Sequence, residues 1–213
     1  MRQSPVFESL SSSLPEPTKW QTVNTMPTAW VTPHDADYAQ RVGLCDRSFL
    51  NRFGVKGAGA ADWLASFGIP VPAQPNQWCD RPDGVLVARL GLTEFLIEDS
   101  IDSALTAFLT QQPLSPKVYP VLRQDFAFAL TGAVVPDLLR QTCNVNFQAL
   151  NLSDRPVILT SMIGVSVIVI PGERERTPFY RVWCDGTFGA YMWETLAAIA
   201  QEMGGGAIGA AYG

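Results

Sequence analysis

The sequence predicts an α+β protein built from two tandem ferredoxin-like units, each with the element order βαββα. Strand-like and helix-like patterns alternate between residues 49 and 203, and their order occurs twice. "FGVKGAGAADWL" (53–64) also aligns without gaps on "FALTGAVVPDLL" (128–139), which indicates an internal duplication. The predicted boundaries are an N-terminal arm at 1–40, a first α+β repeat at 41–116, a second at 117–203 and a flexible tail at 204–213.

In the first repeat, "FLNRFGVKG" predicts a strand ending at Gly57, and "AGAADWLASFG" predicts a short helix. A proline-rich loop follows. Residues 85–99 then predict two strands with a turn near Gly91. The segment "SIDSALTAFLTQQ" predicts a helix capped by Asp99 or Ser100.

In the second repeat, residues 123–132 predict a strand, and a helix begins soon afterwards with Pro136 in its tolerated first turn. Two strands are expected to meet near Gly164, and "TPFYRVW" predicts another strand. A helix is expected over residues 185–203 with Asp185 as its cap. Its predicted apolar face consists of Phe188, Tyr191, Met192, Leu196 and Ile199.

The second repeat is predicted to be the longer one. Gly57 and Gly132 are 75 residues apart, whereas the capping aspartates Asp99 and Asp185 are 86 apart. The 11 additional residues are expected around "PGERERTP" (171–178), the densest charge cluster of the chain.

Composition excludes several classes of function. Apolar residues make up 47% of the chain, charged residues 16%, and the net charge is −5 without any basic stripe, so no nucleic-acid partner is expected. The four cysteines form no C-x-x-C pair and do not predict a zinc site. No signal peptide is recognised, and the most apolar run (156–170) is too short to span a membrane. A cytoplasmic protein with reduced cysteines and no membrane association is predicted.

The glycines of "KGAGAAD" suggest a phosphate-binding loop at first sight. A dinucleotide fingerprint needs G-x-G-x-x-G after a buried strand, but the third glycine is missing here. The preceding strand carries Arg52 and Lys56, which a strand buried on both faces rarely tolerates. The second repeat keeps Gly132 and has Val134 in place of Gly59. The segment is therefore predicted to be a tight corner, although a weak anion role for the helix start stays open.

The candidates for chemistry are few. His34 is the only histidine, and no G-x-S-x-G elbow supplies a nucleophile for it. The acidic pairs Glu98/Asp99 and Asp35/Asp37 are interpreted as structural, with the first pair on opposite faces of a strand. We therefore predict no catalytic residue and no metal site.

Partner contact is the better-supported kind of site. The candidates are the charged loop residues Arg174, Glu175 and Arg176, and Trp193, which falls off the predicted helix face and is expected to be exposed. The alternative for the loop is a solvated hairpin turn without a partner.

The order of these motifs resembles the aminomethyltransferase (glycine-cleavage T-protein) and sarcosine oxidase folate-binding superfamily. Its first domain opens with a Gl-x-Asp-x-Ser segment and a v-x-Gly-x-Ala-x-x-x-Leu segment. "LTGAVVPDLL" and "FGAYMWETLAAIAQEMG" are similar to two later motifs of the superfamily, so the resemblance covers roughly residues 42–204. The positions that match the opening are Gly43, Leu44, Asp46, Ser48, Val55, Gly57, Ala60 or Ala61, and Leu64.

Within that superfamily the length resembles the gamma subunit of heterotetrameric sarcosine oxidase. This resemblance implies the fold of the first two T-protein domains and a noncatalytic role beside larger oxidoreductase subunits. It also implies a place in folate-linked one-carbon (N-methyl amino acid) metabolism. No third domain is expected in this chain, and Arg181 stands where the T-protein motif has a carboxylate. No cofactor is therefore expected to be bound by this chain itself.

Two alternatives remain open. One is a stand-alone tetrahydrofolate-binding or aminomethyltransferase-like protein, which would need a pocket with a carboxylate for the pterin ring. The other is a structural or oligomerising module that acts as a homo-oligomer.

Overall fold

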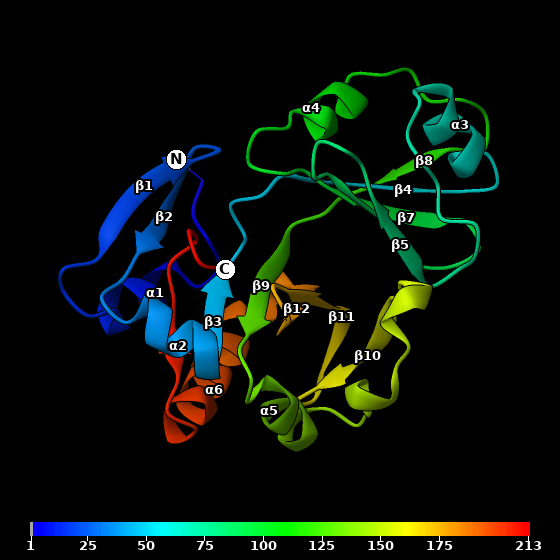
Figure 1. Cartoon of the computed structure of the whole chain (residues 1–213). Coiled ribbons are helices and arrows are strands. Elements are labelled where there is room, and N and C mark those ends of the chain that lie inside the picture. The colour runs from blue at the N-terminus through cyan, green and yellow to red at the C-terminus, as the bar shows by residue number, and fades with distance from the viewer. Residues whose placement is uncertain (1) are drawn as a thin grey trace. The chain divides into compact units, whose positions relative to one another are not determined.

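The computed structural model describes residues 2–213, which fall into two compact units (Figure 1). Unit 1 combines the chain up to Phe49 with Asp125–Leu150 and Thr160–Gly213. Unit 2 combines Leu50–Gln124 with Asn151–Leu159. The chain therefore passes from unit 1 to unit 2 twice, first for most of unit 2 and then for the short Asn151–Leu159 segment.

Unit 1 contains a six-stranded sheet of order β10-β11-β12-β9-β3-β13 and a separate β1-β2 hairpin. The 3₁₀ turns η1 (Phe147–Ala149) and η3 (Gly186–Phe188) join its elements. Its helices and strands are α1 (Phe7–Ser13), β1 (Lys19–Val23), β2 (Met26–Val31), α2 (Asp35–Arg41), β3 (Gly43–Asp46), β9 (Asp125–Thr131), α5 (Val135–Thr142), β10 (Ile158–Met162, entered from unit 2), β11 (Val165–Arg174), β12 (Thr177–Asp185), α6 (Gly189–Glu202) and β13 (Gly206–Ala207).

Unit 2 contains a five-stranded sheet of order β5-β6-β7-β4-β8. One face of this sheet packs on the helices and forms a core that includes Phe53, Val87, Ile97 and Trp63. The elements of unit 2 are β4 (Arg52–Lys56), α3 (Ala60–Ser66), β5 (Gln77–Asp80), β6 (Leu86–Arg89), β7 (Glu94–Glu98), α4 (Leu105–Thr110), β8 (Tyr119–Val121) and η2 (Leu152–Asp154).

The two sheets repeat one strand order, and they exchange one strand each. In both, a helix-flanked strand (β4 or β9) lies between the last strand of a three-stranded meander and a short strand (β8 or β3), which is the sheet edge in unit 2 and is followed by β13 in unit 1. β3 precedes β4 in the chain but pairs with β9, while β8 precedes β9 but pairs with β4. The predicted pair of self-contained βαββα units is therefore corrected, because each sheet includes a strand that leads into the other repeat. β5, inside the predicted proline-rich loop, adds a further strand.

The predicted equivalence of Gly57 and Gly132 is confirmed. Both have positive φ, +119° and +124°. A Cβ at Gly57 would lie 2.1 Å from the Lys117 oxygen, and one at Gly132 would lie 2.2 Å from the Arg41 oxygen. Each oxygen also accepts a hydrogen bond from the residue two positions after the glycine, at 3.2 Å and 2.9 Å respectively. These corners are structural, as predicted. Each glycine contacts the chain just before the exchanged strand begins, β8 in unit 2 and β3 in unit 1.

The N-terminal segment predicted as a loose arm is ordered in the structure. Residues 2–40 contain α1, β1, β2 and α2, and Val6 and Leu10 are 1% and 3% exposed. No clear periodicity marks this segment, because its elements are short and each buries only a few side chains.

The predicted flexible tail is also ordered. β13 pairs in parallel with β3, and the Gly209 N–H donates to Asp35 Oδ1 at 2.8 Å. The other Asp35 oxygen accepts from the Thr32 N–H at 2.8 Å. Glycine-rich composition suggested flexibility, but Gly209 is required for close contact, since a Cβ there would lie 2.3 Å from the Trp30 oxygen.

The additional length of the second repeat lies mostly elsewhere than predicted. When the two sheets are aligned by their strand pairing, Val87 of unit 2 corresponds to Val169 of unit 1. These residues are 82 positions apart, whereas the corner glycines are 75 apart. Phe95 matches Tyr180, 85 residues later. Seven residues are thus added before β11 and only three in the β11–β12 hairpin. By the same pairing, Asp99 matches Cys184 and not Asp185, so the predicted equivalence of the two aspartates is wrong by one position.

The predicted apolar face of α6 is rotated by about one residue. Gly189, Met192, Trp193, Leu196 and Ala200 are its buried residues, whereas Phe188 and Tyr191 are 47% and 50% exposed. The observed set follows the i, i+3, i+4, i+7 spacing from Gly189, the first helical residue, and the prediction started the helix too early.

Glycine corners offer a direct test of this fold. We expect Gly57→Ala and Gly132→Ala each to lower the free energy of unfolding by at least about 2 kcal/mol, because a Cβ meets a main-chain oxygen at positive φ. Gly91→Ala is the control, since nothing lies within 4 Å of its Cβ, and it should change stability by less than about 0.5 kcal/mol. Guanidinium unfolding measures the free energy of unfolding of all three variants. Equal losses in the corner variants and in the control would contradict the structural role of the two corner glycines.

Candidate functional site

The charged loop of the sequence is the tip of the β11–β12 hairpin. Glu175 and Arg176 form a two-residue turn, both with positive φ (+52° and +67°), and both side chains are exposed. Arg174 is held by the fold, because its guanidinium lies 4.2 Å above the Phe179 ring and donates to the Gly213 main-chain oxygen at 2.9 Å. All three side chains are exposed, and Arg174 is the one anchored by contacts within the fold.

The prediction that Trp193 is exposed is wrong. Its side chain is 1% exposed, and its ring contacts Phe126 edge to face with centroids 6.3 Å apart. Trp193 belongs to the face of α6 that packs on the sheet. The exposed aromatic side chains of this region are Phe188 and Tyr191, and the Tyr191 hydroxyl donates to the Ile163 oxygen at 3.0 Å.

The acidic pair Glu98/Asp99 is structural, as expected. Glu98 accepts from Arg52 at 3.3 Å, and these side chains are only 3% and 1% exposed. Asp99 receives the Thr106 hydroxyl at 2.5 Å and the Thr106 N–H at 3.1 Å, which caps the first turn of α4. Burial raises the pKa of the Asp99 carboxyl, while the hydrogen bonds from Thr106 and Ser103 act in the opposite direction.

Sequence reasoning missed the charges on the helix-free face of the unit 2 sheet. Arg52 and Glu98 lie on this face, and Arg123 donates to Glu94 at 2.7 Å beside them. Arg52 argues in the sequence against a strand buried on both faces, but the arginine is itself buried and paired with Glu98. The available signal was one arginine and one glutamate in two predicted strands. The sequence does not show that these two residues pair directly across the sheet.

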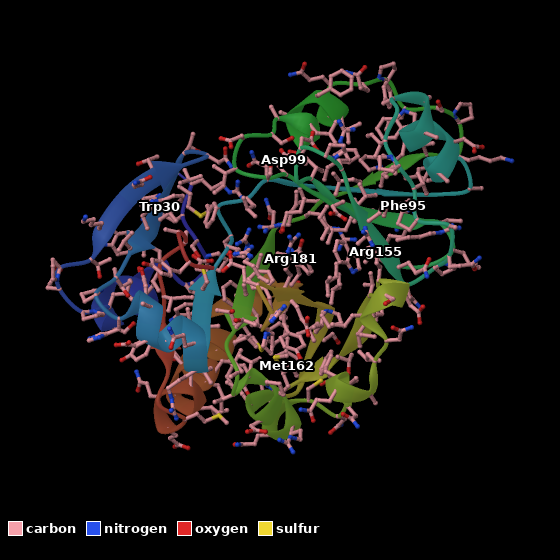
Figure 2. All side chains as sticks on the ribbon, in the orientation of Figure 1. Trp30, Phe95, Asp99, Arg155, Met162 and Arg181 are labelled. Atoms are coloured by element: carbon pink, nitrogen blue, oxygen red, sulfur yellow. The ribbon has the colours of Figure 1, made fainter. Side chains whose placement is uncertain are left out.

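A further charged contact holds the Asn151–Leu159 segment to the rest of unit 2. Arg155, labelled in Figure 2, donates to Asp80 at 2.6 Å and stacks 5.2 Å above the Trp78 ring. Its main-chain oxygen accepts from the Trp78 N–H at 3.0 Å. The contact fixes the Asn151–Leu159 segment against β5.

The remaining chemical candidates of the sequence are His34 and the side chains that could bind a metal. His34 is exposed at the start of α2, with its ring 5.3 Å from that of Tyr38. Within residues 2–213 no cluster of three or more histidine, cysteine or acidic side chains has metal-binding geometry. No helix in that same range is long and apolar enough to cross a membrane.

The four cysteines are free, and three are buried. Burial raises the pKa of the Cys45 and Cys184 thiols to about 12 in each case. The thiolate is the reactive form of cysteine, so these two side chains behave as small apolar groups and not as nucleophiles.

Solved structures of known proteins share this fold. An aminomethyltransferase T of the glycine cleavage system from Bartonella henselae matches with a TM-score of 0.76 and 13% identity, over 99% of this chain and 60% of that one. A chain of the heterotetrameric sarcosine oxidase from Corynebacterium sp. U-96, solved with pyrrole 2-carboxylate, matches with a TM-score of 0.64 and 20% identity, over 95% of this chain and 96% of that one. No protein-family model and no curated protein matches the sequence.

This chain therefore spans about three fifths of the aminomethyltransferase and nearly the whole length of the sarcosine oxidase chain. The resemblance inferred from the motifs is confirmed at the level of the fold. The chain has the mixed α+β fold that these two proteins share.

The thiols should differ sharply in reactivity. We expect an aromatic disulfide reagent to modify Cys79 first in the native protein, because Cys79 is half-buried while Cys45, Cys143 and Cys184 are buried. Raising the pH toward 9 should speed the reaction at Cys79, whereas Cys45 and Cys184, with pKa values of about 12, stay protonated until the protein unfolds. Cys79→Ser should abolish the fast phase; a fast phase that persists in this variant would contradict the assignment.

The buried ion pair predicts a non-additive effect on stability. Glu98→Leu removes one partner of the buried Arg52 guanidinium and should lower the free energy of unfolding, whereas Arg52→Leu/Glu98→Leu, which also removes the buried positive charge, should cost less than the two single variants added together. Unit 1 carries Ala127 and Trp183 at the matching positions, which shows that an apolar pair fits this site in the fold. Arg81→Leu, which breaks the exposed Arg81–Asp83 pair, is the control and should cost less than about 1 kcal/mol. An additive double variant would contradict the prediction.

Proposed function

We propose that the chain is a noncatalytic subunit that works like the gamma subunit of a heterotetrameric sarcosine oxidase. The observation that carries this proposal is the match in extent: the chain and one chain of that enzyme cover each other over 95% and 96% of their lengths. The aminomethyltransferase is matched over only 60% of its length.

In this proposal the partners are larger oxidoreductase subunits that carry the cofactors, and the chain acts in the cytoplasm in folate-linked one-carbon metabolism. We further infer that its two repeats arose by internal duplication. The corner glycines and the repeated strand order support that origin.

The tip of the β11–β12 hairpin is the proposed partner contact. The β11–β12 hairpin is longer than the β6–β7 hairpin of unit 2. Beyond the point where β6 and β7 end, β11 and β12 form three more residue pairs, from Gly172–Phe179 to Arg174–Thr177. The tip therefore projects further from its sheet than its counterpart in unit 2. Glu175 and Arg176 at its end are exposed charges of opposite sign, which suit the polar rim of an interface.

Affinity purification of the full tagged chain from its native cells tests the subunit role. We expect larger subunits to co-purify with the chain in fixed stoichiometry. The double charge reversal Glu175→Arg/Arg176→Glu should weaken recovery of the large subunits, because it places like charges opposite each other at the contact.

Asp137→Arg/Arg140→Glu reverses an exposed pair on α5 and is the matched control. If the hairpin variant and the control recover the partners equally, the contact assignment fails while the subunit role stands. If the wild-type chain elutes alone as a homo-oligomer, the subunit role fails. Saturable binding of tetrahydrofolate by the isolated chain in calorimetry would instead favour a stand-alone folate-binding protein.

A further inference from the structure

The corner at Gly57 in unit 2 carries large side chains that are open to solvent. Four residues form what we call the corner surface: Lys56, Leu92, Lys117 and Tyr119. Leu92 and Tyr119 are 76% and 57% exposed, and both lysines are exposed as well. Single exposed apolar residues are common on protein surfaces, whereas groups of them mark binding sites.

Main-chain contacts hold the four residues of the corner surface together. Lys56 pairs directly with Tyr119 across β4 and β8. A Cβ placed on Gly57 would lie 3.1 Å from the Tyr119 ring and 2.1 Å from the Lys117 oxygen. The Gly57 N–H donates at 2.9 Å to the oxygen of the residue after Leu92. The four residues therefore lie around one point of unit 2, although they come from three separate stretches of the chain.

The corner surface is positively charged, although the chain as a whole carries a net charge of −5. The stretches that form it contain two of the three lysines of the chain and no acidic residue. They are residues 54–60, 91–93 and 115–122. Glu94 is paired with Lys56 across β7 and β4, but its carboxylate accepts from Arg123 at 2.7 Å. Because that carboxylate is already engaged by an arginine, the surface keeps an excess of positive charge.

The matching corner of unit 1 is covered by the chain itself. The strand pair that corresponds to Lys56 and Tyr119 has much smaller side chains. It consists of Thr131 and Gly43. Thr131 is only 6% exposed, and a Cβ on Gly43 would lie 2.8 Å from the side chain of Ile208, which is 2% exposed. One copy of the corner thus lies under an apolar residue of the C-terminal segment, whereas the other copy is open and carries larger side chains.

We propose that the corner surface binds an acidic and apolar surface of a larger partner subunit, at a contact other than the hairpin tip. This inference rests on the proposed subunit role. Exposed lysines beside leucine and tyrosine are complementary to carboxylates set among apolar side chains. Burial of Leu92 and Tyr119 at the contact would remove apolar area from water.

The sequence of β8 also indicates how the partner is bound. Pro120 has no N–H to offer to an added strand, so the contact is made through side chains. Lysine and proline are common protections of a free sheet edge against aggregation. Protection alone does not account for the exposed Leu92 and Tyr119, because exposed apolar side chains work against it.

Zero-length carbodiimide cross-linking of the purified native assembly tests the contact. The reagent joins a lysine amine to a carboxylate where the two groups touch, and the chain has only three lysines. We expect Lys56 and Lys117 to be joined to acidic residues of a larger subunit, which peptide mass spectrometry identifies. Lys19, exposed on β1, is the internal control and should stay unlinked.

Charge reversal provides a second measurement. Lys56→Glu/Lys117→Glu should lower the recovery of the larger subunits with the tagged chain at least tenfold, because it places like charges opposite each other. Lys19→Glu/Arg140→Glu changes the charge of the chain by the same amount at exposed positions elsewhere and should recover them like the wild type. An unchanged melting temperature shows that each variant folds, and the cross-linking uses the wild-type chain only.

The outcomes separate this inference from the proposed function. If the wild-type chain recovers no larger subunit, the subunit role fails and the partner contact fails with it. If the larger subunits co-purify but neither Lys56 nor Lys117 is linked to them, the subunit role stands and the corner surface is wrong. Links from these lysines to a second copy of the chain, or equal recovery by the two double variants, would also overturn the proposal.

Discussion

The contact on which both units depend is a main-chain oxygen pressed against a glycine at the start of a helix. In unit 2 the oxygen belongs to Lys117 and the glycine is Gly57; in unit 1 they are Arg41 and Gly132. The contact fixes where the next strand enters the sheet, and it satisfies an N–H group at the helix start that has no partner within the helix. Edge strand, central strand and helix are thus positioned together by one close approach that only glycine permits.

The same frame is filled by different chemistry in the two units. Where unit 2 buries the Arg52–Glu98 ion pair, unit 1 buries Ala127 and Trp183. An ion pair in a buried sheet face gains little net stability over apolar residues of similar volume, so its presence in one copy is not required by the fold.

The exchanged strands, β3 and β8, differ between the two units too. β3 is covered by β13, whereas β8 carries Pro120 at the position that matches Leu44. Proline lacks the N–H that an added strand would need.

Local patterns predicted the central elements of both repeats well. Most strands and helices between residues 49 and 203 follow from periodicity, with β5 and β8 as exceptions, and the corner glycines follow from the alignment of the two halves. Three things were out of reach. The short elements of residues 2–40 bury few side chains each, the order within the tail depends on Asp35 about 170 residues earlier, and the buried state of Arg52 depends on its partner across the sheet. Each is decided by a distant contact that local propensity does not contain. For the candidate site, the charges of the hairpin tip were visible in the sequence, but the stacking of Arg174 on Phe179 and the burial of Trp193 were not.

The exchanged strands have a consequence for how the chain is made. β3 leaves the ribosome long before β9, so Cys45 must wait for Ala129, its partner in the ladder, to be synthesised. Unit 2 has its own central strands and β8 available by then, and it can close its sheet first, except for the segment that returns to β5. Until β9 arrives, the first strands of unit 1 present unpaired edges during synthesis, when nascent chains are prone to wrong association. Synthesis order thus makes unit 2 the half that matures early and unit 1 the half that needs the whole chain.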